Sequence, residues 1–297
     1  MHHSASVRLR LDLSYDGTDF SGWAAQPGLR TVQGSLEGAL AMLLRVDDPA
    51  SVRLTVGGRT DTGVHARGQV AHLDVTPAQL EKWTARRRPE EPAWEAPELA
   101  RLRARKLTGI VSRAAPDVVV HSAHVVPAAF DARFSALRRR YEYRLIGAGM
   151  RKDPLVARYT AEVPRPLDFD AVQRASDELL GLNDFTTFCK AREGATAVRD
   201  LLRFEWRRAE DGAYAARIEA DAFCHSMVRA LIGAVVAVGS GRIDHEELVA
   251  LRDARARTSR FTVMPAHGLS LEEIAYPPND ALEARAAATR ARRSAID

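Results

Sequence analysis

The sequence predicts an α+β fold of two similar mixed halves, each with a largely antiparallel sheet flanked by helices. Short segments alternate apolar and polar residues, which is the period-two pattern of half-buried strands. Longer segments carry an apolar residue every three or four positions, as amphipathic helices do. The strands and helices do not follow the regular alternation of a parallel sheet, which favours an antiparallel one.

The first half begins with a strand and a helix. Residues 8–15 alternate between two sets, apolar Leu9, Leu11, Leu13 and Tyr15 and polar Arg8, Arg10, Asp12 and Ser14. After a glycine-containing break, residues 32–45 repeat an apolar side chain every fourth position and end at "DDP". The pattern therefore predicts a strand with one buried face, followed by an amphipathic helix.

Two more strands and an arginine-rich helical region complete this half. The strands cover residues 52–56 and 70–75, and a loop that starts at Gly57 joins them. Residues 77–113 read as helical, with an interruption at 86–98 that we expect to be an exposed insertion. The loop therefore lies at one end of a sheet.

The second half repeats a loose order of strands and helices without a visible sequence repeat. Its expected elements are strands at 138–146 and 157–163, a helix at 168–181, a hairpin across "AEDG", an apolar helix from Phe223 and a closing strand at 268–276. We place the first half at residues 7–127, the second at 128–276, and a disordered tail at 277–297.

The composition permits a nucleic-acid partner without proving one. The formal net charge is +4, and only four of the 43 basic residues are lysines. Arginine forks onto phosphates and stacks on bases, so its excess suits an RNA-binding protein. A GC-rich genome, which raises arginine and alanine together, explains the same bias.

The cysteines and the N-terminus indicate a soluble cytoplasmic protein. Cys189 and Cys224 lie far apart in the sequence and belong to no CxxC or Cys/His cluster, so we expect no disulfide scaffold and a reducing compartment. The chain has no run of 18 apolar residues, and its N-terminus has no hydrophobic signal core.

The loop "GGRTDTGVHARGQVAHLD", residues 57–74, concentrates groups that carry chemistry. Its glycines allow backbone shapes that other residues resist, and it brings Arg59, Asp61 and His65 within seven residues. A bland interpretation is available, because aspartate and threonine favour turns and an Asp–Arg pair can simply tie a loop. A metal site is disfavoured because His65 and His72 lack helical i, i+4 spacing, and a phosphate loop because its lysine is missing.

The loop resembles the G-R-T-D-x-G-V-H-A motif of the TruA-type tRNA pseudouridine synthases, here Gly58 to Ala66. Other segments are similar to further motifs of that family, in family order across roughly residues 8–276: "YDGTDFSGW", "TVQGSLEGAL", "FDARFSALRRRYEY", "LLGLNDFTTFC" and "FCHSMVRALIGAVVAVG". Departures exist as well. Trp23 is followed by Ala24 where the family has glutamine, Ser226 replaces a common histidine, and the 81–105 segment is longer and more charged.

The resemblance implies isomerisation of uridine to pseudouridine at positions 38 to 40 of the tRNA anticodon stem-loop. The bond from N1 to C1′ breaks, the uracil turns, and C5 bonds to C1′. This chemistry needs no cofactor and no metal, and the sequence has no dinucleotide or ATP loop. The implied partner is tRNA, held across the two subunits of a homodimer, with the active-site cleft between the two halves.

The same resemblance assigns site residues. Asp61 is the implied catalytic residue, acting either as a nucleophile on C1′ or as a base on the ribose, and the sequence leaves both open. The implied substrate-binding residues are Tyr141, Arg59, Arg229 and His65.

The resemblance implies roles for Arg229 and Tyr141, and the chemistry of their side chains fits those roles. Arg229 lies in an apolar helix and is the cation we expect to pair with Asp61, while Arg59 holds the flipped-out nucleotide or a phosphate. Tyr141 offers a ring under the extracted uracil, whereas Tyr143 is expected in the core. The arginines near Tyr141, namely Arg133 and Arg138–Arg140, are candidates for contacts with phosphates.

Two rival functions remain open. One is a non-catalytic RNA-binding protein that keeps the fold, which loss of the aspartate would mark, and Asp61 is present. The other is the same chemistry on a different RNA.

Overall fold

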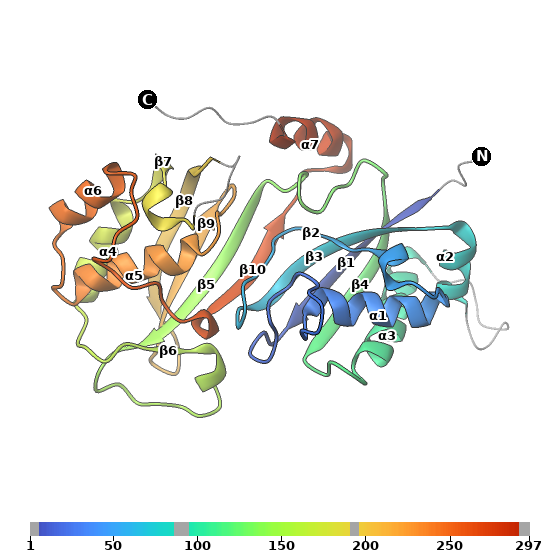
Figure 1. The fold of residues 1–297 in the computed structure, drawn as a ribbon, viewed down its shortest axis with the longest axis horizontal. Coiled ribbons are helices and arrows are strands. Elements are labelled where there is room, and N and C mark those ends of the chain that lie inside the picture. The colour runs from blue at the N-terminus through green and yellow to red at the C-terminus, as the bar shows by residue number, and fades with distance from the viewer. Residues whose placement is uncertain (1–5, 86–94, 191–195, 291–297) are drawn as a thin grey trace. The chain divides into compact units, whose positions relative to one another are not determined.

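The computed structural model describes residues 6–85, 95–190 and 196–290 (Figure 1). The chain is a mixture of helices and largely antiparallel strands, so the predicted α+β class is confirmed. It divides into two compact units, one of Met1–Leu137 with Ile274–Arg290 and the other of Arg138–Glu273. The division falls ten residues later than the expected boundary at 127, because the segment after β4 still packs with the first unit.

The first unit has the strand order β4-β1-β3, with both pairs antiparallel and β2 paired to β3. These strands are β1 (Val7–Tyr15), β2 (Thr55–Val56), β3 (His65–Val75) and β4 (Val118–Val126). Its helices are α1 (Val32–Leu44), η1 (Pro49–Val52), α2 (Pro77–Thr84), α3 (Ala96–Val111), η5 (Asn279–Ala281) and α7 (Leu282–Arg290).

The alternation in β1 has the expected physical cause. Leu9, Leu11 and Leu13 are fully buried on one face, and the polar residues between them are half-buried on the other. Figure 1 shows α1 and α3 on the same side of this sheet. Helix α1 starts where the Thr31 side chain accepts a hydrogen bond from Gly34 N, and ends at Arg45, whose φ is 54°.

The second unit has the strand order β10-β5-β9-β8-β7, with β6 parallel to β5. The strands are β5 (Arg138–Ile146), β6 (Ala161–Glu162), β7 (Gly181–Asp184), β8 (Val198–Arg208), β9 (Tyr214–Ala220) and β10 (Leu269–Ala275), whose last two residues belong to the first unit. The helices are η2 (Ala157–Tyr159), α4 (Phe169–Asp177), η3 (Thr186–Phe188), α5 (Met227–Gly239), α6 (His245–Asp253) and η4 (Ala266–Gly268).

Helix α5 is the core of the second unit. All of its residues except Arg229 are buried, as expected for a helix that is apolar on every side. Its end packs tightly on α4, because a Cβ at Gly239 would lie 2.3 Å from Val172 Cγ2. A single polar side chain thus remains in an otherwise apolar helix.

Several sequence expectations need correction. Of the strand expected at 52–56, only Thr55–Val56 pair, and of 157–163 only Ala161–Glu162. The segment 77–113 forms two helices, and the insertion expected at 86–98 lies mostly outside the described residues. The disordered tail is wrong for Leu282–Arg290, which form α7 with Leu282 buried, while residues 291–297 are not described.

The expectation for the cysteines is also wrong. Cys189 and Cys224 form a disulfide that links the end of η3 to the segment before α5, with their Cα atoms 5.7 Å apart. Both lie near a backbone hydrogen bond from Lys190 N to His225 O of 3.0 Å. Folding brings the two residues together although 35 positions separate them in sequence.

None of the helices in the described ranges has the length and apolar character needed to cross a membrane.

Candidate active site

The Asp61 loop joins β2 to β3 in the first unit. Gly57 N donates to Val70 O at 2.8 Å, which closes the two strands at the loop's base. At its tip, Val64 N donates to Asp61 O at 3.1 Å, and Gly63 has a φ of 78° that favours glycine. Asp61 therefore lies in a tight turn immediately before β3.

The segment 15–23 holds this turn through its backbone. Trp23 N donates to Thr60 O at 3.1 Å, and Gly63 N donates to Phe20 O at 3.4 Å. These two bonds bracket Asp61 on both sides. The two segments that most resemble family motifs in the first half are thus in direct contact.

Two glycines of that segment permit the close approach. A Cβ at Gly17 would lie 2.0 Å from Val64 O, which no side chain can accommodate. A Cβ at Gly22 would lie 3.0 Å from Thr60 O and 3.2 Å from Thr62 N, and its φ is 87°. Glycine is required here by space as well as by backbone conformation.

A buried chain of side-chain hydrogen bonds fixes the residues before Asp61. Gln69 Nε2 donates to Gly58 O at 2.7 Å and to Tyr15 Oη at 3.1 Å. Because Tyr15 accepts from Gln69, its own proton is available to Thr60 Oγ1, which lies 2.8 Å away. The sequence pattern does not single out Tyr15, Thr60 or Gln69 as site residues, because Gln69 stands between Gly68 and Val70 as an ordinary polar strand position.

His65 also joins the Asp61 loop to the glycine segment. It is 7% exposed, and its Nδ1 accepts from Gly17 N at 3.0 Å and lies 3.1 Å from Asp16 Oδ1. The described contacts of His65 therefore connect β3 to the glycine segment.

The two charged residues of the turn are accessible. Arg59 and Thr62 are exposed, and Asp61 is half-buried. Thr60, which lies between Arg59 and Asp61, is buried and anchored to Tyr15. The two charged residues therefore flank one fixed residue.

In the second unit, Tyr141 lies on β5 and faces inward. It is 7% exposed, and its ring meets that of Phe223 edge-on, with centroids 5.1 Å apart at 89°. Tyr143, two residues along the same face, is fully buried, and its hydroxyl donates to Pro265 O at 3.0 Å. Burial raises the pKa of Tyr143, which confirms its place in the core.

Arg229 is held in the first turn of α5. Its Nε donates to Met264 O at 2.6 Å, and Met264 N donates back to Arg229 O at 3.1 Å. This reciprocal pair fixes the base of a half-buried guanidinium group. The expected ion pair of Arg229 with Asp61 joins residues of different units and stays a prediction.

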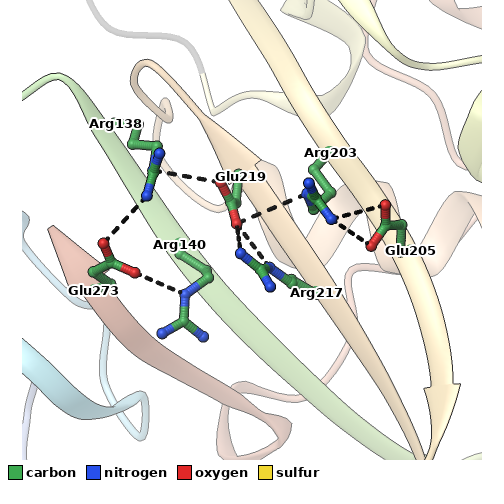
Figure 2. Close-up of polar contacts among 7 residues, drawn as sticks. All are labelled: Arg138, Arg140, Arg203, Glu205, Arg217, Glu219 and Glu273. Carbon is green, nitrogen blue, oxygen red and sulfur yellow. Dashed lines mark hydrogen bonds and ion pairs between the residues drawn. The ribbon is translucent and has the colours of Figure 1, made fainter. Parts of the chain in front are cut away.

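The arginines next to Tyr141 on β5 are already engaged. Figure 2 shows a row of alternating charges across β10, β5, β9 and β8, formed by Arg138, Arg140, Arg203, Glu205, Arg217, Glu219 and Glu273. Arg138 Nη2 lies 3.3 Å from Glu273 Oε1, and Arg140 Nε lies 3.2 Å from Glu273 Oε2. By alternation, both arginines point away from the face of Tyr141.

One carboxylate of this row, Glu273, is stabilised in its charged form. Burial would raise the pKa of Glu273, but hydrogen bonds and charge from Arg140 and Arg138 hold it below its usual value. Glu219 is almost fully buried and has three arginine partners, Arg138, Arg203 and Arg217. Arg139, on the inward face, donates to Asp221 O at 2.9 Å. The arginines expected to follow phosphates here are therefore bound within the protein.

Among the described residues, no group of three His, Cys, Asp or Glu side chains lies close enough together to hold a metal ion. His72 Nδ1 accepts a hydrogen bond from Ala132 N at 3.0 Å.

Comparison with known proteins identifies the family. A family model described as tRNA pseudouridine synthase matches residues 175–277. The protein named tRNA pseudouridine synthase A from Leifsonia xyli subsp. xyli is 52% identical over 290 residues, covering 97% of this chain and 98% of its own. Proteins of the same name from Cutibacterium acnes and Mycobacterium leprae are each 48% identical, covering 98% and 99% of this chain and 96% and 98% of theirs. A solved Nop10–Cbf5 complex of an archaeal box H/ACA sRNP matches only distantly, with a TM-score of 0.30 and 11% identity over 80% of this chain and 53% of that one. The chain therefore belongs to the tRNA pseudouridine synthase A family, whose members are isomerases.

Proposed function

We propose that this enzyme forms pseudouridine at positions 38 to 40 of the tRNA anticodon stem-loop, with Asp61 as its essential carboxylate. The observation that carries the proposal is the fixed geometry of the Asp61 turn. Backbone bonds from Trp23 and Gly63 bracket it, and the chain from Gln69 through Tyr15 to Thr60 anchors its neighbour. A loop that served only to connect β2 and β3 would not need this support.

The chemistry suits a carboxylate held in this way. As a nucleophile, Asp61 attacks C1′ and breaks its bond to N1, and C5 of the freed uracil then displaces the carboxylate from C1′. As a base, it removes a ribose proton so that the bond to N1 breaks, and that proton returns to the ribose when C5 bonds to C1′. In both routes C5 loses its proton and N1 gains one, so uridine and pseudouridine have the same atoms. Preorganised geometry supports either route, because reacting groups must be held in register.

The remaining roles follow from the residues in each unit. The target base must leave its stack, and Tyr141 supplies an aromatic ring for it, worth roughly 1–3 kcal/mol for a stacked base. Arg229 pairs with Asp61 and keeps it ionised, since burial of a carboxylate without a cation is costly. Arg59, exposed beside Asp61, binds a phosphate or the flipped nucleotide. His65 acts by holding the loop against Gly17.

Mapping of the product tests the position directly. Total tRNA is incubated with and without the protein, and pseudouridine is located by a chemical that modifies it selectively. New pseudouridine at 38 to 40 only in the treated sample is the expected result. Product confined to another part of tRNA, or to another RNA, would contradict the proposed position.

The partner and cellular setting are also part of the proposal. The enzyme acts in the cytoplasm as a homodimer that binds tRNA. Light scattering of the purified protein should then give about twice the chain mass of 32.6 kDa. A mass of one chain at micromolar concentration would contradict the dimer.

A further inference from the structure

The first unit contains a second site that shares no residue with the Asp61 loop. A pocket of about 480 Å³ opens between α3 and β4. Its lining residues are Glu98, Arg101, Ala104, Arg105, Val120 and His121. Of these, Ala104 and Val120 are buried and form an apolar floor, whereas the charged residues are exposed.

The frame of this pocket is rigid. Thr108 Oγ1 donates to Val120 O at 3.1 Å and accepts from Val120 N at 3.0 Å, which joins α3 to β4. Arg103 is buried, and its guanidinium group donates to Thr84 Oγ1 at 2.9 Å and to Ala123 O at 3.1 Å. Burial lowers the pKa of Arg103, as expected for a structural cation with neutral partners. Arg103 therefore has a structural role in joining α3 to its neighbours.

The two arginines at the pocket are not used in this way. Arg101 and Arg105 lie four residues apart on α3 and therefore share one face of the helix. Within the described ranges, neither of them forms an ion pair or side-chain hydrogen bond. By contrast, Arg8 and Arg30 in the same unit have aspartate partners at 2.6 and 2.7 Å.

This arrangement is unfavourable without an anion. Like charges at i, i+4 on a helix repel each other and destabilise it. The nearest carboxylate on that face, Glu98, is engaged in a capping box, where it accepts from Glu95 N at 2.9 Å. An anion between the two guanidinium groups would remove the repulsion and would accept hydrogen bonds from both groups.

The opposite wall of the pocket carries an irregularity in β4. The register with β1 passes from Ser122 opposite Asp12 to Val120 opposite Leu13, so His121 is an extra residue in the strand. Such bulges redirect side chains at sheet edges, and β4 is an edge strand of its unit. His121 is exposed, and its Nε2 lies 2.8 Å from Ser14 Oγ.

We propose that the pocket between α3 and β4 binds backbone phosphates of the tRNA through Arg101 and Arg105. This rests on the proposed function, because tRNA is the polyanion that the enzyme takes. The charged lining is exposed, which suits a group on a large polyanion better than an enclosed small anion. The site gives the arginine-rich helix α3 a role in binding tRNA, at a place separate from the chemistry at Asp61.

The first test neutralises the pair. Arg101→Gln/Arg105→Gln is compared with Arg174→Gln/Arg257→Gln, which removes two exposed arginines of the second unit. Titration with tRNA at several salt concentrations should show about tenfold weaker binding at low salt for the first variant. The slope of log affinity against log salt should become shallower by about 2, since each lost phosphate contact removes about one unit. Equal slopes for both variants would overturn the proposal.

The second test removes a negative charge from the pocket and should therefore strengthen tRNA binding. Glu98→Gln removes a negative charge from the pocket, while glutamine can keep the capping box. Binding of tRNA should tighten several-fold in wild-type background and should not change when both arginines are already replaced. Weaker or unchanged binding in the wild-type background would contradict an electrostatic role for the pocket.

Two measurements in parallel separate the possible failures. If the wild-type protein forms no pseudouridine in the same tRNA, the proposed function fails. If it forms the product but the arginine variant binds tRNA as the control does, only the pocket proposal fails. A melting temperature that rises with inorganic pyrophosphate in the wild type alone, with tRNA binding unchanged in the variant, would show a small-anion site and overturn the proposal.

Discussion

The hydroxyl of Tyr15 lies 2.8 Å from Thr60 Oγ1, so the last residues of β1 fix the position directly before Asp61. The phenol also accepts from Gln69, which ties the same point to β3. Through this relationship, the paired strands β1 and β3 hold the Asp61 loop in place. It also allows the role of loop geometry to be tested without touching Asp61.

Tyr15→Phe removes the hydroxyl, so Thr60 Oγ1 loses its 2.8 Å partner and Gln69 Nε2 keeps only its bond to Gly58 O. We expect a loss of stability of about 1–3 kcal/mol and a clear fall in turnover, because the turn loses its anchor. Ser135→Ala is the matched control, since it removes a fully buried hydroxyl that accepts from Asp131 N at 3.0 Å in the same unit. Thermal melting and tritium release from tRNA containing 5-tritiated uridine measure the two effects. If both variants lose activity equally, the Tyr15 bond has no special role.

Gly22→Ala tests the close approach of the glycine segment to the loop. Gly22 has a φ of 87°, and its added methyl would meet Thr60 O at 3.0 Å. Gly212→Ala is the control, because Gly212 has a φ of 85° with nothing within 4 Å of the added methyl. Both should lose about 1–3 kcal/mol from backbone strain, and Gly22→Ala should lose more stability and most of its turnover. Similar turnover in the two variants would contradict the steric argument.

Tyr141→Phe should keep most activity, because the ring that stacks on the base remains. Tyr141→Ala should lose it, with weaker binding of tRNA. Phe223→Leu serves as the control, since it removes only the edge-on neighbour of that ring. Turnover and the melting temperature are measured for all three. Equal turnover for Tyr141→Ala and Tyr141→Phe would remove Tyr141 from the site and leave it a purely structural residue.

The disulfide between Cys189 and Cys224 should stabilise the second unit. It closes a loop across a sequence separation of 35, for which the chain-entropy estimate is about 4 kcal/mol. Reductant should therefore lower the melting temperature of the wild type to that of Cys189→Ser/Cys224→Ser. The double variant itself should not respond to reductant. A wild-type melting temperature that ignores reductant would show that the bond does not form in solution.

The parts of the fold that depend on local pattern could be predicted from the sequence. Leu9, Leu11 and Leu13 stand at every second position because one face of β1 is buried. This two-residue period can be read from the sequence of the strand alone. Strand β4 escaped prediction because the extra residue His121 breaks its period. The disulfide escaped because no local signal reports a contact across 35 residues. Such contacts arise only when the whole unit packs.

The candidate site shows the same division. The glycines around Asp61 signal a tight turn locally, but the bonds from Tyr15 and Gln69 connect distant strands and have no local pattern. For Arg138 and Arg140, closeness to Tyr141 in the sequence suggested phosphate contacts, whereas strand alternation already places them on the face opposite Tyr141. Their carboxylate partners on β9 and β10 became visible only with the strand order.

The role of Arg229 can be separated from that of the fold by a double substitution. Asp61→Asn removes the charge expected to pair with Arg229, which would cost a few kcal/mol if the pair is buried, on the order of 3–5. Arg229→Leu in the same chain should then recover stability without restoring activity. Thermal melting of the single and double variants measures this, and additive losses of stability would argue against the pair.

The most direct test of Asp61 as the essential carboxylate is turnover by Asp61→Asn. The amide has nearly the same size as the carboxylate, so the turn held by Trp23 and Thr60 should keep its shape. It can act neither as a nucleophile nor as a base, so both routes are lost. Asp74→Asn is the control, because Asp74 lies near the far end of β3, away from the turn that holds Asp61, and pairs with Arg8 at 2.6 Å. With tRNA containing 5-tritiated uridine, we expect no release of tritium by Asp61→Asn, with tRNA binding retained, and near wild-type release by Asp74→Asn. Substantial release by Asp61→Asn would contradict the central claim.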